Sequence, residues 1–291
     1  MILASFFLGW APILGKLAYG GGATPYTVVS LRTVVAAAVL WALAAVFWPQ
    51  EIRISLQDLI GCISVGAVNG FGSLLYYTSL SYLEASQASL LNTLYPLWVA
   101  LFLFASGQAL TRLTLTRLAL STFGVYLLTS MGSGEVNWLG VTLMIASAAT
   151  YGWHLVLGQW VLAEISSRKA SPYILTTMAA VVGVARALQG QAVEPILSTG
   201  WIAILGLGLT TALSRFTMFS ALERLGGIET GITGVLELLV SLLLAFLILG
   251  ERLSAIQWIG GVLLIVSLIL MTRDRGMELA KGNEPLEWRT D

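Results

Sequence analysis

Long apolar runs fill this chain from end to end, and clusters of glycine, proline and charged residues interrupt them nine times. An apolar helix of about twenty residues crosses the ~30 Å hydrocarbon core of a bilayer. Only helices and closed barrels satisfy their backbone there, and runs without strict alternation are helices. The pattern therefore predicts ten spans, at residues 2–19, 26–48, 59–80, 86–106, 114–131, 138–162, 173–188, 198–222, 229–249 and 255–272.

The composition agrees with an all-α integral membrane protein. Of the 291 residues, 57% are hydrophobic and only 10% are charged, against about 25% charged residues in soluble domains. The connecting segments are short, so no separate soluble domain is expected. The first apolar run lacks the basic leader and cleavage motif of a signal peptide. We therefore expect it to be the first retained span.

Several classes of function are disfavoured by the residues that the chain lacks. A formal net charge of zero gives no basic surface for nucleic acid. The single cysteine, Cys62, excludes an intrachain disulfide and a thiolate metal cluster. The single histidine excludes a multi-histidine metal site, and there is no glycine-rich phosphate loop with its lysine. We expect no metal, no cofactor and no ATP hydrolysis within this chain.

The basic residues predict how the chain is oriented in the membrane. If the spans alternate, both termini and the even-numbered loops share one side, and that side carries ten lysines and arginines against four on the other. Cytoplasmic loops carry the excess of lysine and arginine. Both termini are therefore expected in the cytoplasm, and the membrane is expected to be the inner (plasma) membrane. The four on the other side are Lys16, Arg32, Arg186 and Arg252.

A weak internal repeat relates the two halves of the chain. Residues 8–16 resemble residues 151–159, with Trp153 following Trp10 by 143 positions. Five spans per half is an odd number, so the second half would be inverted, as in transporters whose substrate site lies between the halves. Chance similarity of apolar helices remains the alternative. Two further pairs of segments match, 23–26 with 170–173 and 94–97 with 236–239. The predicted units are residues 1–131, residues 136–272 and a polar tail, 273–291.

Two patterns stand at corresponding places in the two halves: residues 80–85 followed by Tyr95, Pro96 and Leu97, and residues 221–225 with 249–253. Through these residues and its ten spans the chain resembles the drug/metabolite transporter superfamily, in its EamA-type branch. The resemblance implies a secondary transporter, and the aromatic content is most similar to bacterial exporters of aromatic amino acids. Two departures stand out: residues 107–110 lack the acidic residue that Glu251 supplies in the other copy, and Glu237 with Leu238 replaces an apolar residue and proline.

Three ionisable residues, Glu237, His154 and Arg215, lie inside predicted spans. Glu237 is near the middle of the ninth span, and an intramembrane carboxyl is costly unless it is protonated, paired or facing water. We expect it to face a central cavity; a buried neutral carboxyl that bonds a neighbouring helix is the alternative. His154 follows Trp153, where it could contact substrate, carry a proton or form a helix-packing hydrogen bond. Arg215 is either a functional residue or an anchor that extends to the interface.

The remaining candidates are polar or aromatic residues with helical spacing. Asn69 and Tyr76 share a face of the third span with Tyr77 adjacent, and Asn92 and Tyr95 share a face of the fourth. They are expected to line one chamber, although interhelical hydrogen bonding would also explain them. Tryptophan is enriched at membrane interfaces, so the mid-span pair Trp10 and Trp153 is expected to face the chamber as flat walls for an aromatic or apolar substrate.

The leading hypothesis is a carrier that alternates access to this chamber, with an amino acid as substrate and the lipid bilayer as surroundings. Pro12 and Pro96 remove backbone hydrogen bonds and would form hinges or static kinks. An intramembrane enzyme would need convergent catalytic groups, which one histidine and one mid-span glutamate do not supply. A channel or a structural subunit is the further alternative. The substrate, the direction of transport, proton coupling and the oligomeric state stay open.

Overall fold

The structure is a computed structural model, and it describes residues 2–105, 112–130, 137–162, 164–190, 195–225 and 228–282. Every regular element in these ranges is helical. The helices are α1 (Ile2–Gly9), α2 (Ala11–Gly20), α3 (Pro25–Phe47), η1 (Pro49–Ile52), α4 (Leu56–Tyr82), α5 (Ala85–Asn92), α6 (Tyr95–Ala105), α7 (Arg112–Ser130), α8 (Trp138–Leu162), α9 (Ser167–Leu188), α10 (Ser198–Leu225), α11 (Ile228–Leu244), η2 (Ala245–Leu249) and α12 (Ala255–Gly282).

Within the part of the chain that the structure describes, five helices are long and apolar enough to cross a membrane, in agreement with an all-helical membrane protein. Four of them have bounds within three residues of predicted spans, because breaker residues end the apolar runs there. The exception is α9, which begins at Ser167, six residues before the predicted start at 173, and continues through Pro172. A serine or threonine caps several of these helices: the Thr24 hydroxyl accepts a hydrogen bond from the Thr27 amide at the start of α3, and the Ser55 hydroxyl accepts one from Asp58 at the start of α4. The five are Pro25–Phe47, Leu56–Tyr82, Trp138–Gln159, Ser167–Leu188 and Ser198–Met218.

Three of the predicted spans are interrupted in the structure. The first breaks at Trp10, between α1 and α2, and the fourth breaks between Asn92 and Tyr95. In both cases a proline, Pro12 or Pro96, is the second residue of the helix that follows, where its missing N–H costs no helical hydrogen bond. The ninth span turns from α-helix into the π-helix η2 before ending at Gly250, whose φ is 69°.

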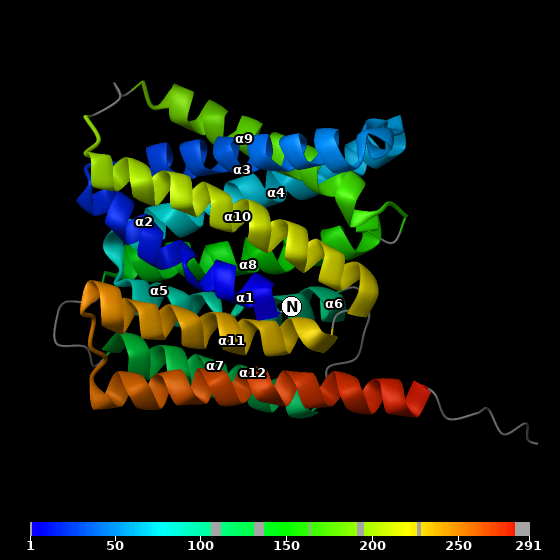
Figure 1. The fold of residues 1–291 in the computed structure, drawn as a ribbon. Helices are drawn as coiled ribbons and strands as arrows, with labels where there is room; N and C mark the ends of the chain where they lie inside the picture. The colour runs from blue at the N-terminus through cyan, green and yellow to red at the C-terminus, as the bar shows by residue number, and fades with distance from the viewer. Residues whose placement is uncertain are drawn as a thin grey trace, which may run out of the picture.

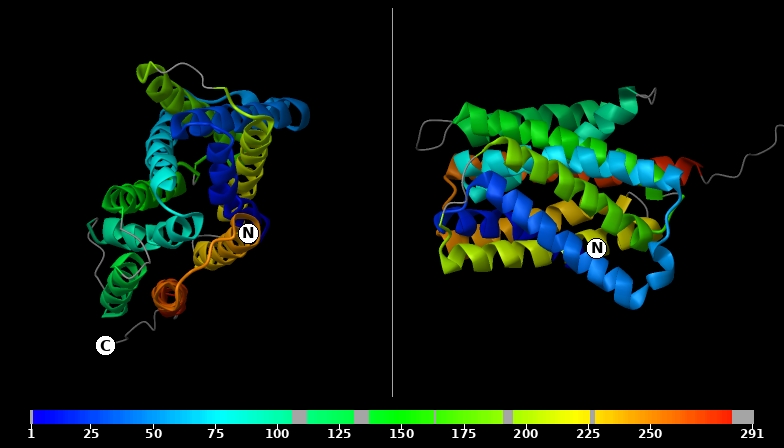
Figure 2. Two further views of the ribbon diagram at one scale, coloured as in Figure 1. Left: turned by 90° about the vertical axis from the view of Figure 1, so that its left-hand side faces the viewer. Right: turned by 90° about the horizontal axis from the view of Figure 1, so that it is seen from above.

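The helices form one bundle, with the α7–α12 pair along one side and α3 with α9 along the other (Figure 1). The α1–α2 segment lies inside the bundle, between α4 and α10 (Figure 2, left). Glycines allow close helix approach on α4: a Cβ atom on Gly66 would lie 2.5 Å from the Ile174 carbonyl oxygen of α9, and one on Gly72 would lie 2.5 Å from Thr150 Oγ1 of α8.

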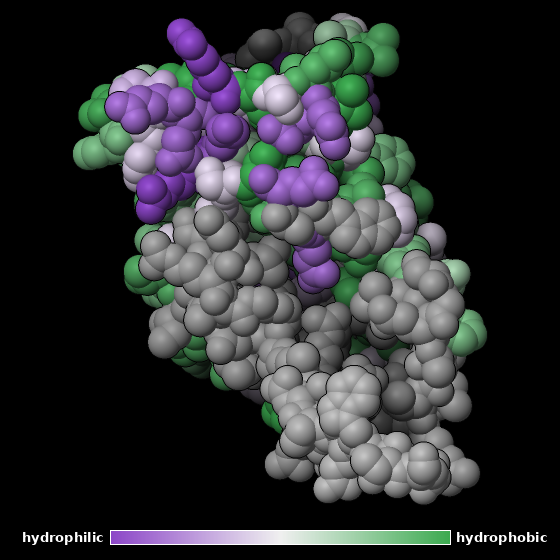
Figure 3. All heavy atoms as spheres, turned by 90° about the vertical axis from the view of Figure 1, so that its right-hand side faces the viewer, coloured by the Kyte–Doolittle hydropathy of each residue, from purple (hydrophilic) through white to green (hydrophobic). Residues whose placement is uncertain are grey.

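Hydrophilic side chains gather at one end of the bundle, in the upper part of the face that Figure 3 shows. At η1 the carboxylate of Glu51 accepts a hydrogen bond from the Ser166 hydroxyl at 2.9 Å and lies 4.0 Å from the Arg168 guanidinium. Elsewhere α12 extends to Gly282, ten residues beyond the predicted end of the last span, so residues 273–282 are helical and not an unstructured tail. The predicted tail beyond 282 and the departure at 107–110 lie outside the described residues.

Candidate substrate-binding cavity

A cavity opens in the middle of the bundle and holds about 690 Å³ of empty space, part of it open to solvent. Residues from eight helices line it, and most of them carry polar or aromatic side chains. They are Phe7, Leu8, Ala11, Arg32, Asn69, Gly72, Ser73, Tyr76, Tyr77, Asn92, Ser147, Tyr151, Thr210, Thr211, Ser214, Arg215 and Glu237.

Helix α4 supplies one wall of the cavity because its residues recur with helical spacing. Asn69, Ser73, Tyr76 and Tyr77 fall on one stripe of the helix and all line the cavity. Gly66, one turn before Asn69 on the same helix, packs against α9. The helix is therefore closely packed near Gly66 and lined by hydrogen-bonding groups from Asn69 onward.

Helix α10 supplies a second polar wall. Its residues Thr210, Thr211, Ser214 and Arg215 line the cavity from two consecutive turns. The Arg215 side chain is 7% exposed, and its Nη2 donates a hydrogen bond to Asn69 Oδ1 at 3.2 Å. The guanidinium carbon of Arg215 also lies 5.4 Å from the ring centroid of Tyr151. Arg215 is thus held inside the bundle, so the anchor interpretation does not describe its position.

Arg32 of α3 brings a second guanidinium to the same cavity. Its side chain is 5% exposed, its Nη1 donates to Thr211 Oγ1 at 3.0 Å, and its guanidinium carbon lies 4.5 Å from the centroid of the Tyr77 ring. Tyr77 is fixed in turn, because the Tyr19 hydroxyl donates to its carbonyl at 2.6 Å. The aromatic face and the hydroxyl acceptor together hold this cation in a defined orientation.

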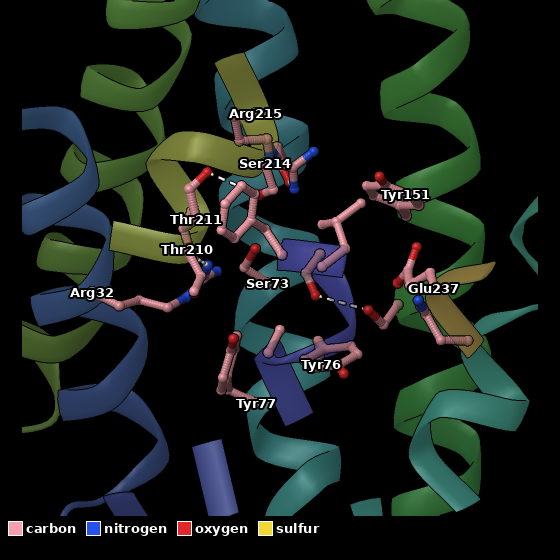
Figure 4. A pocket seen from close by; sticks show the side chains of 17 residues that line it. Arg32, Ser73, Tyr76, Tyr77, Tyr151, Thr210, Thr211, Ser214, Arg215 and Glu237 are labelled. Atoms are coloured by element: carbon pink, nitrogen blue, oxygen red, sulfur yellow. Dashed lines mark hydrogen bonds between the residues drawn. The ribbon is translucent and has the colours of Figure 1, made fainter. Parts of the chain in front are cut away.

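Glu237 of α11 faces the arginines from the other side. Figure 4 shows Arg32 and Glu237 at opposite sides of the cavity, with Tyr76 and Tyr77 along one edge and Arg215 along the other. A smaller space adjoins this end of the cavity, and Glu237, Tyr76 and Asn92 line both spaces. The arrangement gives the cavity a cationic side and an anionic side.

The structure brings together most of the residues that the sequence pointed to. Asn69, Tyr76, Tyr77, Asn92 and Glu237 line the main cavity. Tyr95 lines the smaller space next to it, is 5% exposed, and packs edge-on against Tyr151 with ring centroids 5.0 Å apart.

Three other candidates do not line either space. Trp10 packs edge-on against Phe6, with centroids 6.4 Å apart, and Trp153 packs against Phe102 at 5.3 Å. The two tryptophans therefore do not face each other across the cavity. His154 is fully buried, and its Nδ1 lies 3.3 Å from the Val65 carbonyl oxygen of α4, which corresponds to the helix-packing alternative.

Sequence reasoning missed Arg32, Tyr151 and the α10 hydroxyls as cavity residues. Arg32 lies two turns inside α3, and that depth is the signal that could have distinguished it from a loop charge. Among the described residues no group of three or more histidine, cysteine, aspartate or glutamate side chains could hold a metal ion.

The repeated glycines of the two halves form similar crossings. A Cβ atom on Gly9 of α1 would lie 3.0 Å from the carbonyl oxygen of Glu237. A Cβ atom on Gly152 of α8 would lie 3.0 Å from the carbonyl oxygen of Tyr95. Each glycine thus admits the backbone of a cavity-side residue from the other half of the chain.

Comparisons with known proteins agree with this architecture. The EamA-like transporter family matches residues 1–130 and 138–273. The uncharacterized transporter YcbK of Bacillus subtilis (strain 168) is 24% identical over 267 residues, which cover 87% of this chain and 85% of YcbK. A solved crystal structure superposes with a TM-score of 0.69 at 19% identity, covering 95% of this chain and 96% of the other, and this likeness concerns the fold alone. Because the family match spans most of the sequence, the chain belongs to the EamA-like transporter family and is a multi-pass membrane transporter.

Proposed function

We propose that this protein is a secondary transporter that exports amino acids with aromatic or large apolar side chains across the inner (plasma) membrane by alternating access. The observation that carries the proposal is the cavity between α3, α4, α10 and α11, which has guanidinium groups on one side and the carboxylate of Glu237 on the other. A free amino acid carries a carboxylate, which can face the guanidinium groups, and an ammonium group, which can face Glu237.

The remaining lining supports a substrate with an aromatic or apolar side chain. The rings of Phe7, Tyr76 and Tyr151 and the aliphatic side chain of Leu8 offer contact surface between the polar groups. Asn69, Tyr77 and Asn92 offer hydrogen bonds, and Tyr95 closes the adjoining space. In this proposal Glu237 receives the substrate ammonium group or, between substrates, a proton.

The proposed mechanism uses ten spans arranged as two inverted halves, with both termini in the cytoplasm. The family match to 1–130 and 138–273 and the paired crossings at Gly9 and Gly152 support the two halves. The helix breaks at Trp10 and between Asn92 and Tyr95 adjoin the cavity lining and would act as hinges, since a broken helix bends where its hydrogen-bond ladder is interrupted.

Counterflow in proteoliposomes tests the proposal. Vesicles that contain the purified full-length protein are loaded with unlabelled phenylalanine, leucine, glutamate, lysine or glucose, and uptake of labelled phenylalanine is followed. We expect internal phenylalanine and leucine to accelerate uptake, and glucose to leave it unchanged. If no amino acid on either side exchanges, the proposed substrate class is wrong. If uptake proceeds without acceleration by internal substrate and without saturation, the protein is a channel.

A further inference from the structure

Three buried N–H groups on the cavity wall have no hydrogen-bond acceptor within the part of the chain that the structure describes. They are Nε of Arg32, Nδ2 of Asn69 and Nη1 of Arg215, and the three side chains are 5%, 3% and 7% exposed. Buried donors are almost always satisfied, because an unmet donor loses its hydration without replacement. Three such donors around one space indicate a ligand that supplies acceptors.

The protein fixes the orientation of these donors. Arg215 Nη2 donates to Asn69 Oδ1, so the amide group of Asn69 must direct its NH₂ elsewhere. Nη1 of Arg32 donates to Thr211 Oγ1, whereas Nε of Arg32 has no acceptor. The rings of Tyr77 and Tyr151 hold the two guanidinium groups in place. The three unpaired groups are therefore all donors, two of them on cations, which is the pattern that binds an oxyanion.

The charge count of the lining indicates what kind of oxyanion fits. The residues that line the cavity carry two guanidinium groups and one carboxylate, Glu237, and no other charged side chain is among them. A ligand carboxylate beside the two guanidinium groups and a ligand ammonium group beside Glu237 would each meet a charge of opposite sign in a site of low dielectric. A phosphate dianion would bring a second negative charge to the cavity that already holds Glu237.

We propose that Arg32, Asn69 and Arg215 form a carboxylate-binding subsite, which orients the substrate with its carboxylate between α3, α4 and α10 and its positive end toward Glu237. The inference rests on the proposed function of the cavity as the transport site. It implies that the carboxylate contributes more to recognition than the ammonium group does, because three fixed donors surround the first and one carboxylate faces the second.

Ligand binding to the purified full-length protein in detergent tests the subsite without requiring transport. The probes are phenylalanine, phenylalaninamide (which lacks the carboxylate), phenylacetate (which lacks the ammonium group), and inorganic phosphate, each titrated against thermal unfolding. We expect the acid to bind about 10–100-fold more tightly than the amide, since hydrogen bonds to charged groups are each worth a factor of this order. Phenylacetate should lose less affinity than the amide does.

Two matched variants separate the subsite from the rest of the cavity. Asn69→Asp places a carboxylate beside Arg215, where it can pair with the guanidinium and keep the protein folded. Asn137→Asp makes the same change outside the cavity, at the start of α8, where Asn137 Oδ1 accepts a hydrogen bond from the Gly140 amide. We expect Asn69→Asp to abolish the preference for acid over amide, and Asn137→Asp to retain it.

The outcomes distinguish this inference from the proposed function. Discrimination between acid and amide that survives Asn69→Asp, or that Asn137→Asp removes equally, overturns the subsite. Asn69-dependent stabilisation by phosphate and not by either carboxylate overturns the assignment to a carboxylate, as does the absence of stabilisation by every probe. Binding that behaves as expected in a protein that shows no counterflow leaves the subsite in place and removes the transport proposal. Phenylalanine counterflow without discrimination between acid and amide removes the subsite and leaves the transport proposal in place.

Discussion

Two helix crossings of similar construction lie on different sides of the bundle and present different chemistry. At the α1–α11 crossing, Gly9 approaches the backbone of Glu237, whose carboxylate faces the main cavity. At the α6–α8 crossing, Gly152 approaches the backbone of Tyr95, whose ring packs against Tyr151 beside the smaller space. The close backbone approach is shared, while the side chain that it positions differs. We therefore propose that the repeated glycines hold the helices together, and that the difference between Glu237 and Tyr95 serves substrate binding.

The largest expected effect is the difference in counterflow between a substitution at Glu237 and one at Tyr95. Glu237→Gln keeps the shape of the side chain and removes its charge, so phenylalanine counterflow should fall about 10–100-fold if the carboxylate receives the ammonium group. Tyr95→Phe keeps the ring packing and should change counterflow only a few-fold. Initial rates in proteoliposomes with equal amounts of protein measure both. Equal losses in the two variants would contradict the functional asymmetry.

The next effect tests the shared close backbone approach. A Cβ atom on Gly9 would lie 2.6 Å from Val240 Cγ1 and 3.0 Å from the Glu237 carbonyl, so Gly9→Ala forces α1 and α11 apart. We expect a loss of about 1–3 kcal/mol of stability, as for other overpacked sites. Gly152→Ala, with its nearest contact at 3.0 Å, should cost less.

Gly183→Ala is the matched control for both glycine variants, because no atom lies within 4 Å of the added Cβ. Alanine has the higher helix propensity, so this variant should be neutral or slightly stabilising in thermal unfolding. A Gly9→Ala protein that melts at the same temperature as the control would show that the crossing is not close-packed.

A smaller effect is expected at a polar contact away from the cavity. Both carboxylate oxygens of Glu251 accept backbone hydrogen bonds, from Ala85 and Ser86 at 2.8 Å each, at the start of α5. Because these groups are fully paired, Glu251→Gln should lower stability by about 1 kcal/mol through loss of the charged cap. The discrimination between acid and amide ligands should not change; a change would mean that this contact contributes to substrate selection.

The smallest effect is a pH dependence at the same end of α5. Burial raises the pKa of Glu84 above its ordinary value of 4.5, and the nearby charge of Glu251 raises it further, while Lys16 acts in the opposite direction. The folded protein then holds this proton more tightly than the unfolded chain does, so the contribution of Glu84 to stability is fully present below pH 4.5 and is lost as the pH rises through the raised pKa. Thermal unfolding of Glu84→Gln should lack this part of the pH dependence. An unchanged pH profile would contradict it.

The sequence predicted the helical spans better than it predicted the site. Spans such as 138–162 and α8 coincide because the apolar run and its breakers fix both ends. Hinges or kinks were predicted at Pro12 and Pro96, and the helices break just before both prolines, between α1 and α2 and between α5 and α6. Glu237 and Asn69 were recognisable because a polar group inside a membrane helix needs a partner or a cavity.

The residues that sequence reasoning misplaced show what a repeat alone can indicate. The match between 8–16 and 151–159 drew attention to Trp10 and Trp153, whose rings pack against Phe6 and Phe102. The part of that match that matters for the fold is the glycine before each tryptophan, Gly9 and Gly152, because each allows a close helix crossing. Glycine has no side chain, so the sequence did not suggest this role. Arg32 was counted as an outer charge, and only the fold shows that α3 turns it toward Thr211 and the cavity.

The central claim, that this cavity is the transport pathway, is tested most directly by comparing two serines of α4. Ser73 lines the cavity, whereas the Ser79 hydroxyl donates to the Gly140 carbonyl in the packed contact with α8. Each is changed to cysteine in a Cys62→Ala background, and an anionic methanethiosulfonate reagent is applied during phenylalanine counterflow. We expect Ser73→Cys to react, to lose transport, and to be protected by phenylalanine, while Ser79→Cys remains unreactive. Modification of Ser73→Cys that leaves transport intact, or an unreactive Ser73→Cys in an active protein, would contradict the account.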